Sequence, residues 1–191
     1  MSVSIANLER EKYEAVWSLD IYRIKCHSLN LWENHREIFP ENFRTALDIG
    51  CGLGYLMAAW NEEGYDAWGI DIAANCLASD ISARWGKRFI VENLWEMELG
   101  VHFDLGICAD VMEHIPEEFI ERTLKNIARH CNETIFSIAN FSSNSLGHNL
   151  HLTQKPLDWW LGMFQSVGPE PEVLSLGGRN NVYHLRWRIC G

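Results

Sequence analysis

The sequence predicts an α/β fold built on a doubly wound, seven-stranded and mainly parallel sheet. Two observations lead to this prediction. First, apolar strand-like runs alternate with helix-like segments through most of the chain, at the intervals of βαβ units. Second, this alternation stops near the C-terminus, where two strand-like runs flank the turn 177–181 and indicate an antiparallel hairpin strand.

The composition is that of an ordinary globular protein. With 191 residues, the chain is long enough for one well-cored domain, so residues 1–191 are predicted to form a single domain. The net charge of −10 and the lack of a basic run argue against nucleic acid as a partner. No signal peptide or membrane span is visible, so we expect a cytoplasmic protein. The oligomeric state is not predicted.

The N-terminal part of the chain has helical periodicity. Between residues 7 and 37, apolar residues such as Tyr13, Trp17 and Ile21 recur at spacings close to one helical turn. Pro40 closes this segment. We expect residues 1–40 to form a helical brace, or else a lid over a site.

The remaining elements follow from hydrophobic periodicity and from glycine and proline positions. Gly64 ends the first helix after the first strand, and the Pro-Glu-Glu turn at Pro116 starts a later one, because acidic residues suit a helix N-terminus. The predicted strands are 43–50, 65–71, 88–91, 103–108, 134–138, 173–176 and 182–189. The predicted helices after the first strand are 53–63, 73–85, 116–130 and 156–167, with a polar loop at 140–154.

A glycine-rich turn links the first strand to the helix after it. Gly50, Gly52 and Gly54 follow an apolar strand that carries Asp48, and such a bare backbone lets a ligand approach a helix N-terminus closely. A dinucleotide-binding turn needs G-x-G-x-x-G, and Tyr55 stands where its third glycine would fall. A nicotinamide dinucleotide dehydrogenase is therefore disfavoured.

The G-x-G-x-G spacing resembles that of class I S-adenosylmethionine-dependent methyltransferases, from about residue 44 to residue 140. Three further matches occur in order along the chain. These are Asp71 at the end of the second strand, the run 89–94 in the third, and the run 103–116 with its D-V-M-E-H-I sequence after the fourth. The resemblance implies a Rossmann-like methyltransferase fold, S-adenosylmethionine as cofactor and S-adenosylhomocysteine as product.

The resemblance also implies roles for individual residues. Asp71 would accept hydrogen bonds from the ribose hydroxyls. Asn93, where the family usually has Asp, would hold the adenine edge, and Asp110 would face the methylsulfonium and the acceptor. The predicted cofactor-binding residues are Asp48, Gly50, Cys51, Gly52, Gly54, Asp71, Ile72, Asn93, Leu94 and Asp110.

Methyl transfer from a sulfonium is an in-line displacement, so holding donor and acceptor close and aligned supplies most of the acceleration. A hydroxyl acceptor also benefits from a base that titrates near neutrality. His114, after the fourth strand, and His151, in the loop after the fifth, are the two candidates for the catalytic base. A capping or solvated role is the alternative for each.

A metal site is considered and not predicted. Asp110, Glu113 and His114 fall on one helical face, and ubiquinone-pathway O-methyltransferases use a similar E-x-x-E-H arrangement for a divalent ion. Many relatives with D-x-x-E-H bind none. His148 and His151 have a zinc-like spacing but no third ligand nearby. The six cysteines show no metal-ligand spacing either, so we expect reduced, structural thiols.

The acceptor is the least determined feature. Trp159 and Trp160, or the N-terminal aromatic residues, could wall a pocket for an organic molecule, and Arg23 could meet a carboxylate. We expect a small-molecule substrate methylated on oxygen. The alternatives are a protein or RNA methyltransferase and a non-catalytic subunit that binds S-adenosylmethionine.

Overall fold

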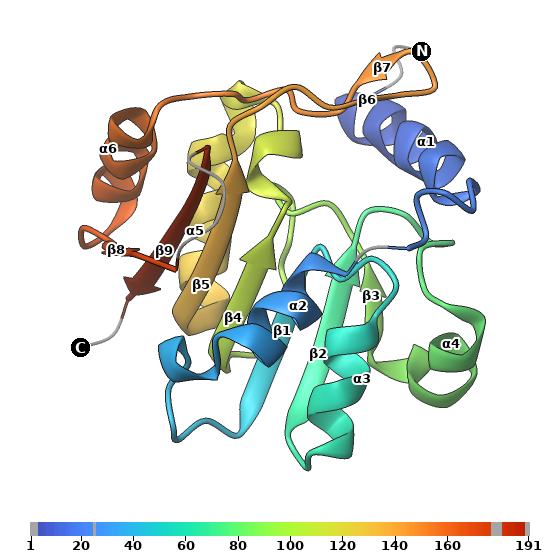
Figure 1. Cartoon of the computed structure of the whole chain (residues 1–191), viewed down its shortest axis with the longest axis horizontal. Helices are drawn as coiled ribbons and strands as arrows, with labels where there is room; N and C mark the ends of the chain where they lie inside the picture. The colour runs from blue at the N-terminus through green and yellow to red at the C-terminus, as the bar shows by residue number, and fades with distance from the viewer. Residues whose placement is uncertain (1–3, 25, 177–180, 190–191) are drawn as a thin grey trace.

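A computed structural model describes residues 4–24, 26–176 and 181–189. Its centre is a seven-stranded sheet in the order β3-β2-β1-β4-β5-β9-β8 (Figure 1). The neighbours among β1 to β5 are parallel, whereas β9 is antiparallel to both β5 and β8. The predicted sheet, including its antiparallel C-terminal strand, is confirmed. The strands are β1 (Thr45–Ile49), β2 (Asp66–Asp71), β3 (Phe89–Val91), β4 (Phe103–Ala109), β5 (Cys131–Ala139), β8 (Glu172–Leu174) and β9 (Val182–Arg188).

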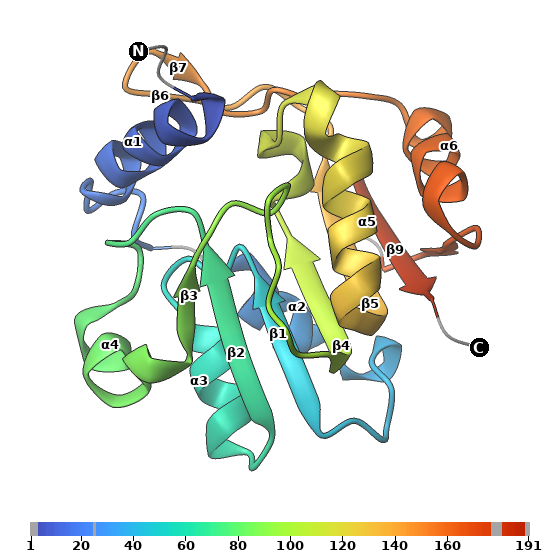
Figure 2. The same cartoon turned by 180° about the vertical axis from the view of Figure 1, so that it is seen from behind.

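Helices cover both faces of the sheet. On one face, α2 (His27–Asn34) and α3 (Tyr55–Glu62) bury Trp32, Leu56 and Trp60 against β1 and β4. On the other, α5 (Ile120–His130) and α6 (Leu157–Val167) pack against β4, β5 and β9 (Figure 2). The alternation of strand and helix produces these two layers because each parallel connection must cross a face of the sheet.

The carboxyl ends of the parallel strands lie at one edge, and two further elements sit beyond it. These are α1 (Ile5–Trp17) and a small antiparallel pair, β6 (Asn144–Ser145) with β7 (His148–Asn149) (Figure 1). The strand order reverses between β1 and β4, and ligands of open α/β sheets bind at such a point.

Two predicted helices differ from the structure. The N-terminal helical segment is divided, because α1 ends at Trp17 and α2 begins only at His27. The helix predicted at 73–85 begins only at α4 (Ser79–Trp85). Arg23 accounts for the second difference, since its guanidinium donates to the carbonyls of Asn75 and Leu77 and holds that segment outside a helix. Most of the predicted turn 177–181 lies outside the described residues.

The C-terminal strand is anchored by one tryptophan. The Trp187 side chain is fully buried and packs against Phe136 and Phe164 at ring-centroid distances of 6.4 and 5.0 Å. Its indole N–H donates to the carbonyl of Pro169 at 2.7 Å. Trp187 therefore connects β9 with β5 and with the end of α6.

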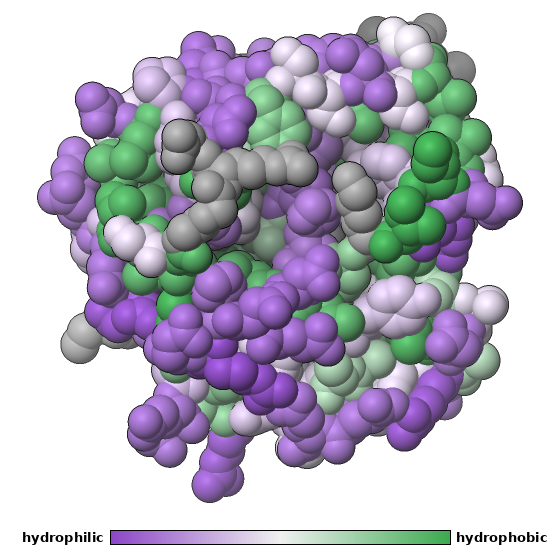
Figure 3. Space-filling view, in the orientation of Figure 1, coloured by the Kyte–Doolittle hydropathy of each residue, from purple (hydrophilic) through white to green (hydrophobic). Residues whose placement is uncertain are grey.

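The face shown in Figure 3 is mostly hydrophilic over α2 and α3. Apolar side chains gather near the segment between α1 and α2, where Ile21 and Ile24 are 78% and 71% exposed. In the part of the chain that the structure describes, no helix is long and apolar enough to span a membrane.

Replacing Trp187 with Ala should lower the free energy of unfolding by about 3–5 kcal/mol, because a large buried side chain and its hydrogen bond are both lost. Chemical denaturation monitored by circular dichroism would measure the change. Trp159→Ala is the matched control, since Trp159 is only partly buried and should cost clearly less. Equal losses in the two variants would contradict the anchoring role.

Candidate active site

Two neighbouring cavities lie at the carboxyl edge of the sheet. The first, of about 100 Å³, lies between α1 and the ends of β2 and β3. The second, of about 360 Å³, lies between residues 17–28, the glycine turn and residues 141–151. Five residues line both cavities and form the wall between them. They are Trp17, Tyr22, Gly50, Asp110 and His114.

The glycine turn allows close packing on both sides of this wall. Gly50 and Gly52 have φ angles of +71° and +48°, which favour glycine. A Cβ on Gly52 would lie 2.8 Å from the ring of Trp17, and a Cβ on Gly50 would lie 2.3 Å from Val111, in the segment after β4. The turn amides of Gly50 and Cys51 both donate to the carbonyl of Ile70. The glycines therefore leave room for neighbouring side chains. The amides of Gly50 and Cys51 are already paired with the carbonyl of Ile70.

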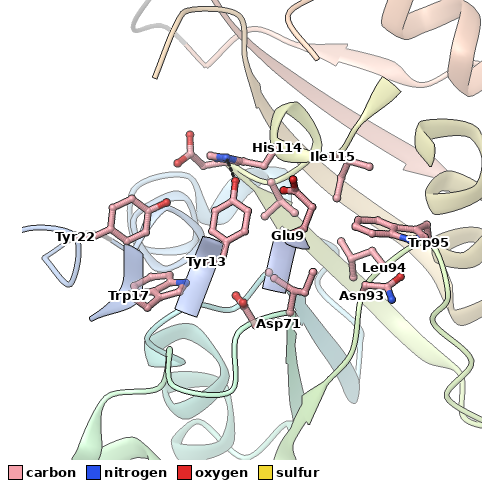
Figure 4. A pocket seen from close by; sticks show the side chains of 14 residues that line it. Glu9, Tyr13, Trp17, Tyr22, Asp71, Asn93, Leu94, Trp95, His114 and Ile115 are labelled. Atoms are coloured by element: carbon pink, nitrogen blue, oxygen red, sulfur yellow. Dashed lines mark hydrogen bonds between the residues drawn. The ribbon is translucent and has the colours of Figure 1, made fainter. Parts of the chain in front are cut away.

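Asp71 lies at the end of β2 and faces the first cavity. Its two carboxylate oxygens accept the amides of Gly52 and Ala73, each at 3.0 Å. Burial raises the pKa of Asp71 to about 6, while the two amides act in the opposite direction. The carboxylate is thus fixed in place and still presents acceptor sites to the cavity (Figure 4).

Asn93 lines the first cavity, but its amide is already engaged. Its oxygen accepts the amide of Glu96 at 2.9 Å, and its nitrogen donates to the carboxylate of Glu96 at 2.5 Å. Asn93 therefore acts as a local cap for the turn after β3. Leu94 and Ile72 line the same cavity with apolar surface.

Asp110 occupies a strained position in the shared wall. Its φ of +62° is in the left-handed region, which asparagine and aspartate tolerate better than most residues. One carboxylate oxygen lies 3.4 Å from Nε2 of His27, which lines the second cavity. The backbone at Asp110 thus turns its carboxylate toward both cavities.

His114 is held from α1. Its Nδ1 lies 2.7 Å from the hydroxyl of Tyr13 (Figure 4). The same nitrogen lies 3.0 Å from the carbonyl of Leu150. A carbonyl can only accept, so a hydrogen bond to Leu150 needs the proton on Nδ1, and this tautomer leaves Nε2 with a lone pair. Burial lowers the pKa of His114 to about 4, with nearby His151 acting in the same direction. The imidazole is therefore neutral near pH 7.

His151 lies beside His114, with ring centroids 4.7 Å apart. Its Nδ1 donates to the carbonyl of Phe141, which leaves its Nε2 with a lone pair as well. His151 lines the second cavity and is almost fully buried. The two histidines predicted from distant parts of the sequence are therefore neighbours.

Glu113 connects the segment after β4 to the loop that carries His151. Its carboxylate accepts the amide of Ala139 at 2.7 Å, and its carbonyl accepts the amide of Thr153 at 2.9 Å. Burial and the nearby Asp110 carboxylate raise the pKa of Glu113 well above its usual range. These contacts set the position of residues 151–153 against His114.

One ligand atom each from Asp110, Glu113, His114 and His151 lies within 4.8 Å of the others, a spacing compatible with a bound cation. The second carboxylate oxygen of Glu113 is buried without a hydrogen-bond partner. The expectation that no metal binds here stays a prediction. Its test is whether a chelator such as EDTA leaves activity unchanged.

Among the described residues, the lining of the first cavity carries the carboxylates of Glu9, Asp71 and Asp110, the second cavity shares Asp110, and neither lining includes a Lys or Arg. Such a lining favours a cationic or neutral ligand and disfavours a phosphate.

Several sequence-based candidates lie elsewhere. Asp48 is fully buried below the turn, and Gly54 caps α3, so neither lines a cavity. Trp159 and Trp160 belong to the core packing of α6 and do not wall a pocket. The guanidinium of Arg23 is engaged by three backbone carbonyls and is not available for a carboxylate.

Other lining residues were not predicted. Glu9 joins Tyr13 and Trp17 on one face of α1, and His27 and Trp95 line the second and first cavity respectively. The spacing of residues 9, 13 and 17 at single helical turns is the signal that could have identified Glu9.

Comparisons with known proteins agree with this geometry. Residues 23–176 match the methyltransferase domain family. A solved 1,6-didemethyltoxoflavin-N1-methyltransferase from Burkholderia thailandensis, with S-adenosylhomocysteine bound, is 16% identical with a TM-score of 0.72, covering 100% of this chain and 93% of that one. An S-adenosylmethionine-dependent methyltransferase from Clostridium acetobutylicum is 12% identical with a TM-score of 0.64, covering 95% and 99% respectively. These likenesses confirm the predicted fold.

The curated relatives match a smaller part of this chain than the solved structures do. A ubiquinone biosynthesis O-methyltransferase from Methylococcus capsulatus is 32% identical over 82 residues, which are 39% of this chain and 34% of that protein. One from Idiomarina loihiensis is 26% identical over 151 residues, covering 75% and 56% respectively. The chain thus spans between about a third and just over half of these two relatives. The family match covers most of the chain, and the chain therefore belongs to the methyltransferase domain family.

Proposed function

We propose that the chain transfers a methyl group from S-adenosylmethionine to a hydroxyl of a small, uncharged organic acceptor. The observation that carries the proposal is the wall between the two cavities, where Asp110 and His114 lie next to His151. The donor would occupy the first cavity and reach this wall, and the acceptor would occupy the second. The names of the curated relatives support oxygen as the acceptor atom.

The residues of the first cavity fit the donor in charge. S-adenosylmethionine carries a sulfonium and no phosphate, which suits a cavity whose described lining residues include acids but no Lys or Arg. Asp71 would bind the ribose hydroxyls, and Ile72 and Leu94 would contact the adenine ring. Asn93 fits less well as an adenine ligand, because its amide is paired with Glu96.

The chemistry assigned to the protein is modest. The donor supplies an activated methyl group, and the cavity walls would align it with the acceptor oxygen. Nε2 of His151 would accept the hydroxyl proton, since its Nδ1 proton is fixed by the carbonyl of Phe141. His114 would orient the acceptor. Its pKa is lowered to about 4, so it binds a proton less readily than an imidazole in water does.

The direct test is formation of S-adenosylhomocysteine when the chain is incubated with S-adenosylmethionine and a panel of phenols, sugars, amines, carboxylic acids, peptides and RNA. Turnover with neutral hydroxyl compounds supports the proposal. Turnover with peptide or RNA alone would identify a macromolecular methyltransferase. Cofactor binding without turnover on any acceptor would favour a non-catalytic subunit.

Replacing Asp71 with Asn should weaken binding of S-adenosylhomocysteine by about 1–3 kcal/mol, because hydrogen bonds to an ionised carboxylate are lost. In the unmodified protein, affinity should also fall as pH drops below about 6, where Asp71 becomes protonated. Calorimetric titration between pH 5 and 8 would show both effects, and the variant should lack the change near pH 6. Unchanged affinity in the variant would refute the ribose role.

We propose that residues 1–40 act as a lid over the site, because the ring of Trp17, at the end of α1, lies against Gly52. Gly52 lines only the second cavity, but its amide binds Asp71 of the first. Replacing Gly52 with Ala should weaken binding of S-adenosylhomocysteine, because a side chain at a φ of +48° distorts the turn and shifts this amide away from Asp71. Trp17, which packs against Gly52, should report the distortion as a change in tryptophan fluorescence. Gly100→Ala is the matched control, since Gly100 has a similar φ of +64° but no neighbouring atom within 4 Å of an added Cβ. If both variants bind equally well, the glycine turn is not part of the donor site.

Replacing His151 with Ala should lower turnover by a factor of about 10² or more, the usual contribution of a positioned base. Affinity for S-adenosylhomocysteine should change little, because His151 lines only the acceptor cavity. His114→Ala should cost less turnover than His151→Ala. His148→Ala, an exposed residue of the same loop, serves as control and should retain full activity. Full activity in both His114 and His151 variants would leave alignment alone as the mechanism.

A further inference from the structure

Two of the buried cysteines lie together beside Asp71, although they are far apart in the sequence. The sulfur atoms of Cys51 and Cys76 and one carboxylate oxygen of Asp71 all lie within 4.8 Å of one another. Cys51 belongs to the glycine turn, Asp71 ends β2, and Cys76 lies in the segment before α4. All three side chains are buried.

Neighbouring groups hold these three side chains in place. The amides of Gly52 and Ala73 bind the two oxygens of Asp71. Arg23 donates to the carbonyls on either side of Cys76, those of Asn75 and Leu77. Metal ligands in proteins are oriented by such outer contacts. The cluster thus has fixed geometry without a ligand.

We propose that Cys51, Cys76 and Asp71 form a binding site for a thiophilic divalent cation such as Zn²⁺ or Cd²⁺. Two sulfurs and one carboxylate oxygen are a ligand set that zinc accepts. Around a tetrahedral zinc ion, two sulfur ligands lie about 3.8 Å apart. The sulfur atoms of Cys51 and Cys76 lie within 4.8 Å of each other, which is compatible with this distance. Asp71 lines the first cavity and Cys51 the second, so water and a cation can approach the cluster from these two sides.

Binding would proceed with loss of two protons. Each thiol gives its proton to solvent, and the two thiolates with the Asp71 carboxylate coordinate the ion, so no oxidant or reductant is needed. Burial raises the pKa of both thiols when no cation is present, which keeps them protonated near pH 7. Affinity for the cation should accordingly increase with pH.

The site also has a consequence for the donor. Asp71 is the residue assigned to the ribose hydroxyls, so a cation at this site and the donor would compete for one carboxylate. This consequence rests on the proposed function, whereas binding of the cation does not. A thiophilic metal would therefore inhibit the protein at the donor site.

The test titrates Cd²⁺ into the reduced, metal-free full chain and records the ultraviolet absorption of cadmium–thiolate bonds. This signal does not arise from Asp110, Glu113, His114 and His151, which contribute no sulfur. The expected result is one thiolate-bound Cd²⁺ per chain. Cys76→Ser should weaken this binding by ~10-fold or more. Cys131→Ala, a buried cysteine that lines neither cavity, should leave it unchanged.

No thiolate signal, or an equal signal in the Cys76 variant, would overturn the site. If Cys76→Ser does not fold, Cys76→Ala removes the same sulfur without burying a hydroxyl and replaces it in the test. Added S-adenosylhomocysteine should displace Cd²⁺ and reduce the signal. If S-adenosylhomocysteine binds without displacing Cd²⁺, the shared use of Asp71 is wrong. If S-adenosylhomocysteine does not bind at all, the proposed function fails while the cation site stands.

Discussion

The carboxylate of Asp71 is the point on which the carboxyl edge of the sheet depends. It is buried, and it accepts one amide from the glycine turn and another from the segment that follows β2. A buried charge is tolerated only when hydrogen bonds compensate for lost hydration, so these two contacts fix both segments. The glycine turn also determines how closely the Trp17 side chain can approach Gly52. The position of Trp17 then sets the boundary between the two cavities.

Periodicity predicts the sheet well because each strand is a short apolar run between turns, and this signal is local. Strands β1 to β5, β8 and β9 all lie where the sequence places them, with ends shifted by a few residues. The helix predicted at 73–85 is wrong in its first part, before α4, and the reason is non-local. The amides and carbonyls of this part are held by Asp71 and by Arg23 from the N-terminal segment, and tertiary contacts of this kind override helix propensity.

The candidate site is predicted in part for the same reason. The strands position most of the site. Asp71 ends β2, and the other predicted residues, namely the glycine turn, Asp110, His114 and His151, come after strands. Parallel strands bring their carboxyl ends to one edge of the sheet. The contribution of α1 is indicated only in part. Single-turn spacing places Glu9, Tyr13 and Trp17 on one face of the helix, but it does not say that this face meets the sheet. Trp160 shows why the sequence leaves a pocket role and a core role open, since an aromatic residue on a helix has the same local pattern in both; the structure places it in the core.

The position of Trp17 also bears on affinity. Trp17 lines both cavities and lies against Gly52, so the binding of a ligand that extends through both would depend on how often this indole is displaced. The measured dissociation constant then equals the intrinsic constant divided by the fraction of molecules with the indole displaced. A small side chain at position 17 would raise that fraction, and tighter binding in such a variant would measure how strongly the helix holds the passage closed.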